Sequence, residues 1–210
     1  MENVSFNYDG KIIFENLNLE LQTGVYWLQG ANGTGKSTLL KLLSNTIKPM
    51  GGNIFYFREN INRLKLIDRQ RIFLCEDELP ELPWLKGYEF FYLYECVYGS
   101  TRRSMFFECL KNFKLTDEIL NQSVLNLSLG QKKKLYLATA FSAGCDLILL
   151  DEPFNGLDSE SMEFLRGLII NYAKTPGKLI LFTSHANPMI EVKSLELIGG
   201  VGSKIIRGGR

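Results

Sequence analysis

A glycine-rich loop between an apolar segment and a helical pattern constrains the fold of this chain more than any other feature. The loop reads Gly30-Ala31-Asn32-Gly33-Thr34-Gly35-Lys36-Ser37-Thr38 and matches the pattern G-x-x-x-x-G-K-[ST]. Val25 to Gln29 is typical of a buried strand, and Lys36 to Asn45 has the pattern of a helix. Glycines let backbone N–H groups approach phosphate oxygens, and the N-terminus of a helix adds partial positive charge. The sequence therefore predicts a phosphate site on a strand–loop–helix unit.

Two side chains of the loop have expected roles in binding a nucleoside triphosphate. Lys36 is expected to reach the β- and γ-phosphates, and Ser37 to offer its hydroxyl group to Mg²⁺. The alternative is an ordinary glycine-rich turn. The strand pattern before the loop and the helical pattern after it argue against that alternative.

A second motif is an apolar strand that ends in two carboxylates, Asp146-Leu147-Ile148-Leu149-Leu150-Asp151-Glu152-Pro153. Ligands of open α/β sheets bind at the carboxyl ends of the strands. Asp151 is therefore expected to hold Mg²⁺, directly or through water. Glu152 is expected to orient and deprotonate a water molecule for attack on the γ-phosphate.

Apolar segments alternate with helical patterns, which predicts an α/β fold with a parallel sheet covered on both faces. Strands are expected at 4–8, 11–14, 17–21, 25–29, 53–57, 71–75, 147–150, 178–183, 194–198 and 204–206. Helices are expected at 36–45, 88–98, 103–113, 117–120, 130–141 and 159–173. We expect one domain over residues 1–210, with a core at 1–77 and 123–210. The first strands form an antiparallel β subdomain of that core, and a helical subdomain is inserted at about 78–122.

Composition limits the classes of function. Net charge is +1, so the chain has no general attraction to nucleic acid or to anionic membranes. No segment reaches the ~18–20 apolar residues that a bilayer span needs, and the first residues lack the pattern of a secretory signal. We therefore expect a cytosolic protein without direct membrane insertion. None of the four cysteines forms a CxxC pair, which favours reduced, mostly buried thiols over a zinc site.

Three motifs in the same order are similar to those of ABC ATPases: the loop at 30–38, the segment Leu127-Ser128-Leu129-Gly130-Gln131, and the strand that ends at Asp151-Glu152. The resemblance to this nucleotide-binding domain runs roughly from Val4 to Arg207. It implies a P-loop NTPase core that binds ATP and Mg²⁺. The nucleotide-binding residues that it implies are Tyr8, Gly30, Ala31, Asn32, Gly33, Thr34, Gly35, Lys36, Ser37, Thr38, Ser128, Gly130, Gln131 and Asp158. It also implies that Ser128 and Gly130 face the γ-phosphate bound to a second subunit.

Three further positions match the family, and each has a simpler alternative. Tyr8 matches the aromatic residue that stacks on adenine, but packing alone would also explain it. Asp158 lies in the segment that resembles the family's D-loop, and it could also cap the following helix, as could Ser159. His185 matches the family's switch histidine, which contacts the γ-phosphate and joins Glu152 and Lys36 as catalytic residues. A lone histidine is more often structural.

One position departs from the family. The family usually has a glutamine after the strand at 71–75, and here Glu76 and Asp77 follow that strand. A carboxylate is a good ligand for Mg²⁺, so Glu76 joins Ser37 and Asp151 as an expected metal ligand. The additional negative charge predicts that ATP binding depends more strongly on Mg²⁺ than it would with glutamine.

The resemblance implies an ATP-hydrolysing subunit that energises a separate membrane permease, with an exporter favoured. Two copies, or a heterodimer, would work on the cytoplasmic face of the membrane. The aromatic segment at 88–94 is expected either to line the permease groove or to pack into the core. The alternative function is a soluble ABC ATPase that acts on ribosomes or DNA. Lys132, Lys133 and Lys134 are too few for a nucleic-acid patch and are expected on a solvated helix face.

Overall fold

The computed structural model describes residues 1–77, 82, 84–99, 102–199 and 204–207, and a six-stranded sheet lies at its centre. The strand order is β11 (Lys204–Arg207), β10 (Lys193–Ile198), β3 (Gly24–Gln29), β9 (Leu179–Thr183), β8 (Leu147–Leu150) and β7 (Ile72–Cys75). Five of these strands are parallel, and β11 pairs antiparallel with β10. The predicted parallel sheet is therefore confirmed, and its carboxyl edge gathers the loops that follow β3, β7, β8 and β9.

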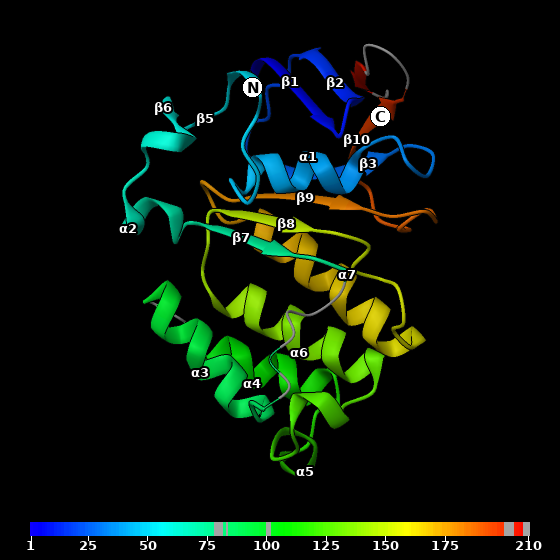
Figure 1. Cartoon of the computed structure of the whole chain (residues 1–210). Coiled ribbons are helices and arrows are strands. Elements are labelled where there is room, and N and C mark those ends of the chain that lie inside the picture. Colours follow the sequence, from blue (N-terminus) through cyan, green and yellow to red (C-terminus); the bar gives the residue numbers. More distant parts are fainter. Residues whose placement is uncertain (78–81, 83, 100–101, 200–203, 208–210) are drawn as a thin grey trace.

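Side chains of the central strands alternate between two hydrophobic cores, one on each face of the sheet. Ile148 and Leu150 belong to the core shared with α6 (Leu129–Ser142) and α7 (Ser159–Ala173). Leu147 and Leu149 belong to the core shared with α1 (Lys36–Leu43). Figure 1 shows α1 on one side of the sheet and α6 and α7 on the other. Burial on both faces explains why β8 is apolar at every position.

A smaller antiparallel sheet covers α1 on the side away from the central sheet (Figure 1). Its order is β2 (Lys11–Leu17), β1 (Glu2–Tyr8) and β4 (Gly51–Asn53). The strand expected at 17–21 is wrong, because β2 ends at Leu17 and the side chain of Asn18 bonds to the backbone of Asn16 and of Asn3 instead. Leu17 and Leu19 are nevertheless buried, as the alternation of apolar residues predicted. A turn with positive φ at Phe57 also shortens the strand expected at 53–57.

Short elements connect this sheet to β7. They are the hairpin of β5 (Phe55–Tyr56) and β6 (Glu59–Asn60), the 3-10 helix η1 (Ile61–Arg63), and α2 (Leu66–Arg69). Leu66 and Ile67 of α2 are largely exposed. The chain then enters the sheet at β7, so these elements lead from the antiparallel sheet to one edge of the central sheet.

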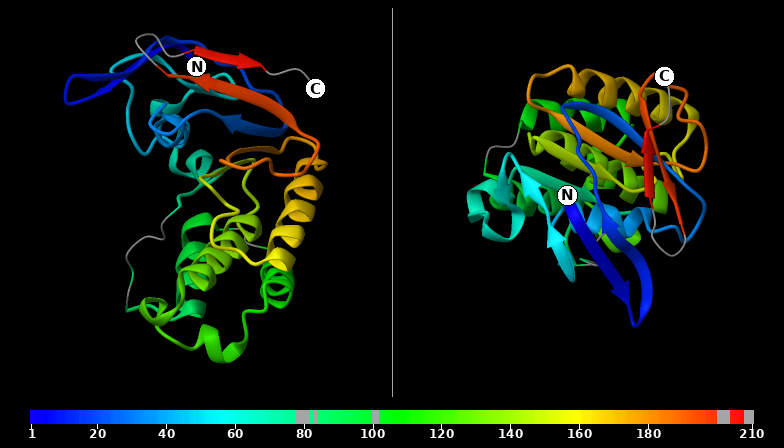
Figure 2. Two further views of the ribbon diagram at one scale, coloured as in Figure 1. Left: turned by 90° about the vertical axis from the view of Figure 1, so that its right-hand side faces the viewer. Right: turned by 90° about the horizontal axis from the view of Figure 1, so that it is seen from above.

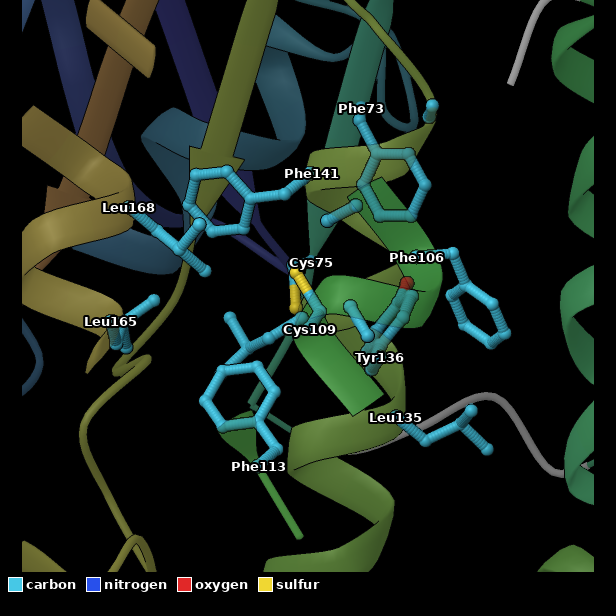
Figure 3. Packing of buried hydrophobic residues seen from close by; sticks show 14 of the residues in the cluster. Phe73, Cys75, Phe106, Cys109, Phe113, Leu135, Tyr136, Phe141, Leu165 and Leu168 are labelled. Atoms are coloured by element: carbon cyan, nitrogen blue, oxygen red, sulfur yellow. The ribbon is translucent and has the colours of Figure 1, made fainter. Parts of the chain in front are cut away.

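A group of helices lies between β7 and α6 in the sequence: α3 (Gly87–Tyr98), α4 (Arg103–Asn112), α5 (Asp117–Leu120) and the 3-10 helix η2 (Val124–Asn126). They lie at the end of the molecule away from the antiparallel sheet (Figure 2). Phe106, Cys109 and Phe113 of this region pack with Leu135 and Tyr136 of α6 (Figure 3). The boundaries of a helical subdomain at 78–122 remain a prediction, and residues 78–81 lie outside the described part of the chain.

The cysteine thiols are free, and three of the four are buried. Cys75 and Cys109 lie in the core drawn in Figure 3, where burial raises the pKa of each thiol to about 12. Burial likewise raises the pKa of Cys145 to about 12, whereas Cys96 is exposed. Among the described residues, no helix has the length and apolarity that a membrane crossing requires.

Candidate nucleotide site

The loop between β3 and α1 has positive φ angles at three glycines, a conformation that other residues rarely adopt. Gly30, Gly33 and Gly35 have φ values of 154°, 76° and 103°. A Cβ atom on Gly35 would lie 2.6 Å from the side chain of Ile13, and one on Gly30 would lie 2.6 Å from the carbonyl oxygen of Leu197. Gly30 and Gly35 are therefore required both by conformation and by space, whereas Gly33 is favoured by its backbone conformation alone.

The N-terminus of α1 offers positive charge that can attract a phosphate group. In the described part of the chain no side chain caps the first N–H groups of α1, whereas Ser128 caps α6 and Asp158 caps α7. Lys36 is buried, and its Nζ donates to the carbonyl oxygens of Gly30 and Ala31 at 2.8 and 3.2 Å. The uncapped helix end and the ammonium group therefore lie at the same loop, an arrangement suited to an anion.

The two carboxylates expected to act on the nucleotide lie at the end of β8 and are buried. The hydroxyl group of Thr183 donates to Asp151 Oδ1 at 2.7 Å and accepts the N–H of Glu152 at 2.8 Å. His185 lies in the loop after β9. Its backbone N–H donates to Glu152 Oε2 at 3.2 Å, and its imidazole Nε2 lies 3.5 Å from Glu152 Oε1. The structure therefore brings together Asp151, Glu152 and His185, as the sequence predicted.

Glu152 has two properties of a reactive carboxylate. Its backbone has a φ of 45°, which is rare and strained for a residue other than glycine. Its Oε1 atom is buried and accepts no hydrogen bond from the described part of the chain. A buried acceptor without a donor is costly and calls for an explanation, and a water molecule to be deprotonated would supply the missing donor.

Glu76 lies after β7, and its carboxylate is bound to a lysine that the sequence analysis did not single out. Lys41 Nζ of α1 lies 2.9 Å from Glu76 Oε1. The hydrogen bond to Glu76 raises the pKa of Lys41. The additional negative charge beside the loop is therefore balanced by a cation within the chain. Lys41 is four residues after Ser37 and so shares its helix face, which is the sequence signal that could have identified it.

Ser128 and Gln131 form the N-terminal cap of α6. Ser128 Oγ accepts the N–H of Gln131 at 3.2 Å, and Gln131 Oε1 accepts the N–H of Ser128 at 2.8 Å. This reciprocal capping box follows from a serine and a glutamine three residues apart, a signal that the sequence analysis missed. Gly130 lies close to the loop after β8, because a Cβ atom there would be 2.9 Å from the carbonyl oxygen of Gly156. Ser128 itself is exposed, as a contact with a second subunit requires.

Asp158 caps α7, which confirms one of the two roles considered for it and excludes Ser159 as the cap. Asp158 Oδ1 accepts the N–H of Ser161 at 2.9 Å. Its other oxygen is bound by Ser161 Oγ and by Lys134 Nζ at 3.0 and 2.5 Å. The hydrogen bond from Lys134 holds the pKa of Asp158 well below its usual range. Lys134 therefore ties α6 to the loop before α7.

The expected solvated face at Lys132, Lys133 and Lys134 is wrong for Lys133, which is only 4% exposed, and for Lys134, whose side chain is 13% exposed and paired with Asp158. Lys133 Nζ donates to the carbonyl oxygen and the carboxylate of Asp77 at 3.0 and 2.8 Å. It also donates to the carbonyl oxygen of Asp151 at 3.4 Å. Its partners lie 56 and 18 residues away in sequence, so a local charge pattern could not reveal its burial.

Tyr8 ends β1 and remains accessible for stacking. Its side chain is 45% exposed, although its ring also contacts Phe6 edge to face at 4.8 Å between centroids. The contact holds one edge of the ring and leaves surface free. Packing and stacking on a base are therefore compatible at this position.

The donor atoms fit a magnesium–nucleotide complex rather than a cation held by protein alone. Within the described ranges, no three side chains of His, Cys, Asp or Glu stand together as a metal site. Mg²⁺ normally takes one or two protein oxygens together with substrate phosphates and water. The hydroxyl of Ser37 and the carboxylate of Asp151 remain the protein oxygens expected to hold such a complex, with Glu76 as the expected third ligand.

Comparisons with known proteins agree with this geometry. The model of the ABC transporter family matches residues 14–155. The cytochrome c biogenesis ATP-binding export protein of Rickettsia felis is 30% identical over 91% of this chain and 94% of its own length. A lantibiotic transport ATP-binding protein of Streptococcus pyogenes is 29% identical over 91% of this chain and 81% of its own length.

A solved structure supports the same fold. The dimeric structure of a bacterial ABC transporter cassette superimposes with a TM-score of 0.81, at 23% identity, over 97% of this chain and 94% of that cassette. The family match covers more than half of the sequence and contains both the phosphate loop and the paired carboxylates. The chain therefore belongs to the ABC transporter family, as an ATP-binding domain of the ABC ATPase type.

Proposed function

We propose that the chain binds ATP with Mg²⁺, hydrolyses it as a dimer, and energises a separate transmembrane permease. The observation that carries the enzymatic part is the buried carboxylate of Glu152, whose Oε1 accepts no hydrogen bond from the described residues and whose Oε2 accepts the backbone N–H of His185. Family membership supports ATP as the nucleotide. Together they favour a working hydrolase over a domain that only binds nucleotide.

Each part of the site has a distinct task in this proposal. The loop N–H groups and Lys36 bind the phosphates, and Ser37 and Asp151 hold the magnesium ion, which neutralises charge on the phosphates. Glu152 orients and deprotonates the attacking water, and His185 contacts the γ-phosphate. Tyr8 stacks on the adenine ring. Low accessibility around Glu152 strengthens these electrostatic interactions because little water screens them.

Dimerisation through ATP is the second part of the proposal. Ser128 and Gly130 stand at the N-terminus of α6, where N–H groups and the helix dipole favour an anion. The exposed serine suits a phosphate bound by another copy of the chain. Asp158 sits at the adjoining loop and is expected to contribute to the same interface. A heterodimer with a related subunit would use the same surfaces.

Transport is the third part, and export is the direction that the relatives favour. The names of the Rickettsia and Streptococcus relatives describe an export protein and a transport protein. We place the chain on the cytoplasmic face of a membrane, held there by its permease. A nucleic-acid role receives no support from a net charge of +1. The transported substrate would be recognised by the permease.

Replacing Glu152 with glutamine tests the enzymatic part. Glu152→Gln keeps the size of the side chain but removes its ability to accept a proton. ATP affinity should remain within about twofold, and turnover should fall by roughly 100-fold or more, the scale of general-base catalysis. Size-exclusion chromatography should show an ATP-dependent dimer that accumulates. Normal turnover in this variant would refute Glu152 as the base.

A further inference from the structure

The peptide group between Asp151 and Glu152 is held at both of its polar atoms. Its carbonyl oxygen accepts a hydrogen bond from Lys133 Nζ of α6 at 3.4 Å. Its N–H donates to Thr183 Oγ1 of β9 at 2.8 Å. The plane of this peptide, from which the Glu152 side chain departs, is therefore fixed between a helix and a strand.

The backbone of Glu152 needs such support. A left-handed conformation at a residue other than glycine costs on the order of 1–3 kcal/mol and persists only where the surroundings impose it. The φ of 45° at Glu152 directs its carboxylate toward the backbone N–H of His185. If the preceding peptide rotated to relieve the strain, the carboxylate would leave this position. The contacts of Lys133 and Thr183 oppose that rotation.

Lys133 is also anchored on its other side. Its Nζ bonds the carboxylate of Asp77 at 2.8 Å and the carbonyl oxygen of Asp77 at 3.0 Å. A buried ammonium group is costly unless charged and polar partners surround it, and Asp77 supplies both. Asp77 belongs to the loop after β7, which leads to the helices between β7 and α6. One buried cation thus joins α6, the loop after β7 and the loop after β8.

We propose that Lys133 is a positioning residue for Glu152, and that it links the loop after β7 to the catalytic carboxylate through Asp77. The inference rests on the proposed function, because it requires Glu152 to act as the base. Lys133 lies outside both the phosphate loop and the segment at 127–131, so neither motif explains its role.

The test replaces the ammonium group and separates catalysis from binding. Lys133→Met keeps the apolar stem and removes every donor. We expect kcat to fall by roughly 10-fold or more, while KM and the Kd for a fluorescent ATP analogue stay within about twofold, the signature of a group that acts only on the chemical step. Lys133→Arg should recover part of kcat, because it retains a charged donor. Asp77→Asn should give a smaller loss, because the Asp151 carbonyl keeps its lysine.

Two controls make the result decisive. Lys132→Met removes a neighbouring lysine of α6 that the proposal does not use, and it should leave kcat unchanged. Glu152→Gln is measured in the same series. If Glu152→Gln stays active, Glu152 is not the base and the proposed function fails. If Glu152→Gln is inactive while Lys133→Met is fully active, only the positioning role of Lys133 is refuted. A parallel loss of ATP affinity in Lys133→Met would also overturn it. If thermal melting shows that Lys133→Met is unfolded, Asp77→Asn with wild-type kcat overturns the proposal instead.

Discussion

At the scale of single residues, the pair of Glu76 and Lys41 sets the charge beside the phosphate loop. The carboxylate of Glu76 is expected to replace the amide that the family usually has after this strand, and Lys41 Nζ balances it at 2.9 Å. Both side chains are more than a third exposed, so solvent screens their attraction and the pair adds little to stability. The pair is instead expected to change the affinity for ATP and its dependence on Mg²⁺, because both ligands are highly charged.

Glu76→Gln should therefore weaken the dependence of ATP binding on Mg²⁺. We expect the ratio of the ATP dissociation constants without and with Mg²⁺ to fall about fivefold, which corresponds to a metal contact worth about 1 kcal/mol. Isothermal titration calorimetry in buffer with Mg²⁺ or with EDTA would measure both constants. Lys41→Met should shift the ratio the opposite way, because it frees the carboxylate. Identical ratios in Glu76→Gln and the wild type would remove Glu76 from the metal site.

At the scale of elements, α6 combines a structural cap and an expected contact with another subunit in one residue. Ser128→Arg should leave ATP binding by the monomer nearly unchanged, while it abolishes the ATP-dependent dimer and hydrolysis. The physical reason is bulk and positive charge at a surface that must approach bound phosphate. Equilibrium binding, light scattering and phosphate release would measure the three properties.

Ser128→Ala is the matched control, because it loses the same cap but adds no bulk. Loss of the cap costs roughly 1 kcal/mol in either variant, so both should melt a few degrees below the wild type. Only the arginine should prevent the dimer. An arginine variant that still dimerises with ATP would contradict the expected role of Ser128 across the interface.

Local signals explain why some elements were predicted within a residue while others were not. The capping aspartate before α7 and the apolar run of β8 act within a few residues, and the bounds of both elements were predicted correctly. The segment at 17–21 has the alternation of a strand, but β2 ends at Leu17. Beyond it, Leu19 exchanges two backbone hydrogen bonds with Met1, and among the described residues the ladder goes no further. Pairing depends on the rest of the chain, so alternation predicted burial but not the strand.

The difference between local and long-range signals also explains which residues of the candidate site were predicted and which were missed. The phosphate loop and the Asp151–Glu152 pair are contiguous motifs, and the structure places Glu152 beside His185 as expected. Lys133 and Thr183 are missed, because their roles arise from partners on other elements. A sequence read without the fold therefore identifies the reacting groups better than the residues that position them.

At the scale of the whole molecule, α3 divides its aromatic residues between the core and the surface. Tyr94 packs inside, with its ring 4.8 Å from that of Phe90, so a core role is confirmed for it. Tyr92, Leu93 and Val97 are 47%, 40% and 50% exposed, and these three define the outer α3 patch. The exposure of Tyr92 favours docking at this patch. α2 is linked to this end of α3 by the bond from Gln70 Nε2 to the Val97 carbonyl oxygen.

We expect the outer α3 patch to receive the permease, because an exposed apolar surface on an otherwise packed helix suits a protein partner. Leu93→Lys should abolish stimulation of ATP hydrolysis by the reconstituted permease, while the ATPase activity of the isolated subunit stays within about twofold, since Leu93 lies on the exposed side of α3, a helix that supplies no expected residue of the nucleotide site. Phe107→Lys is the matched control: Phe107 is an exposed apolar residue of α4, 53% accessible, outside the patch. The assignment holds only if Leu93→Lys loses stimulation and Phe107→Lys keeps it, and equal behaviour of the two variants would place the docking site elsewhere on the molecule.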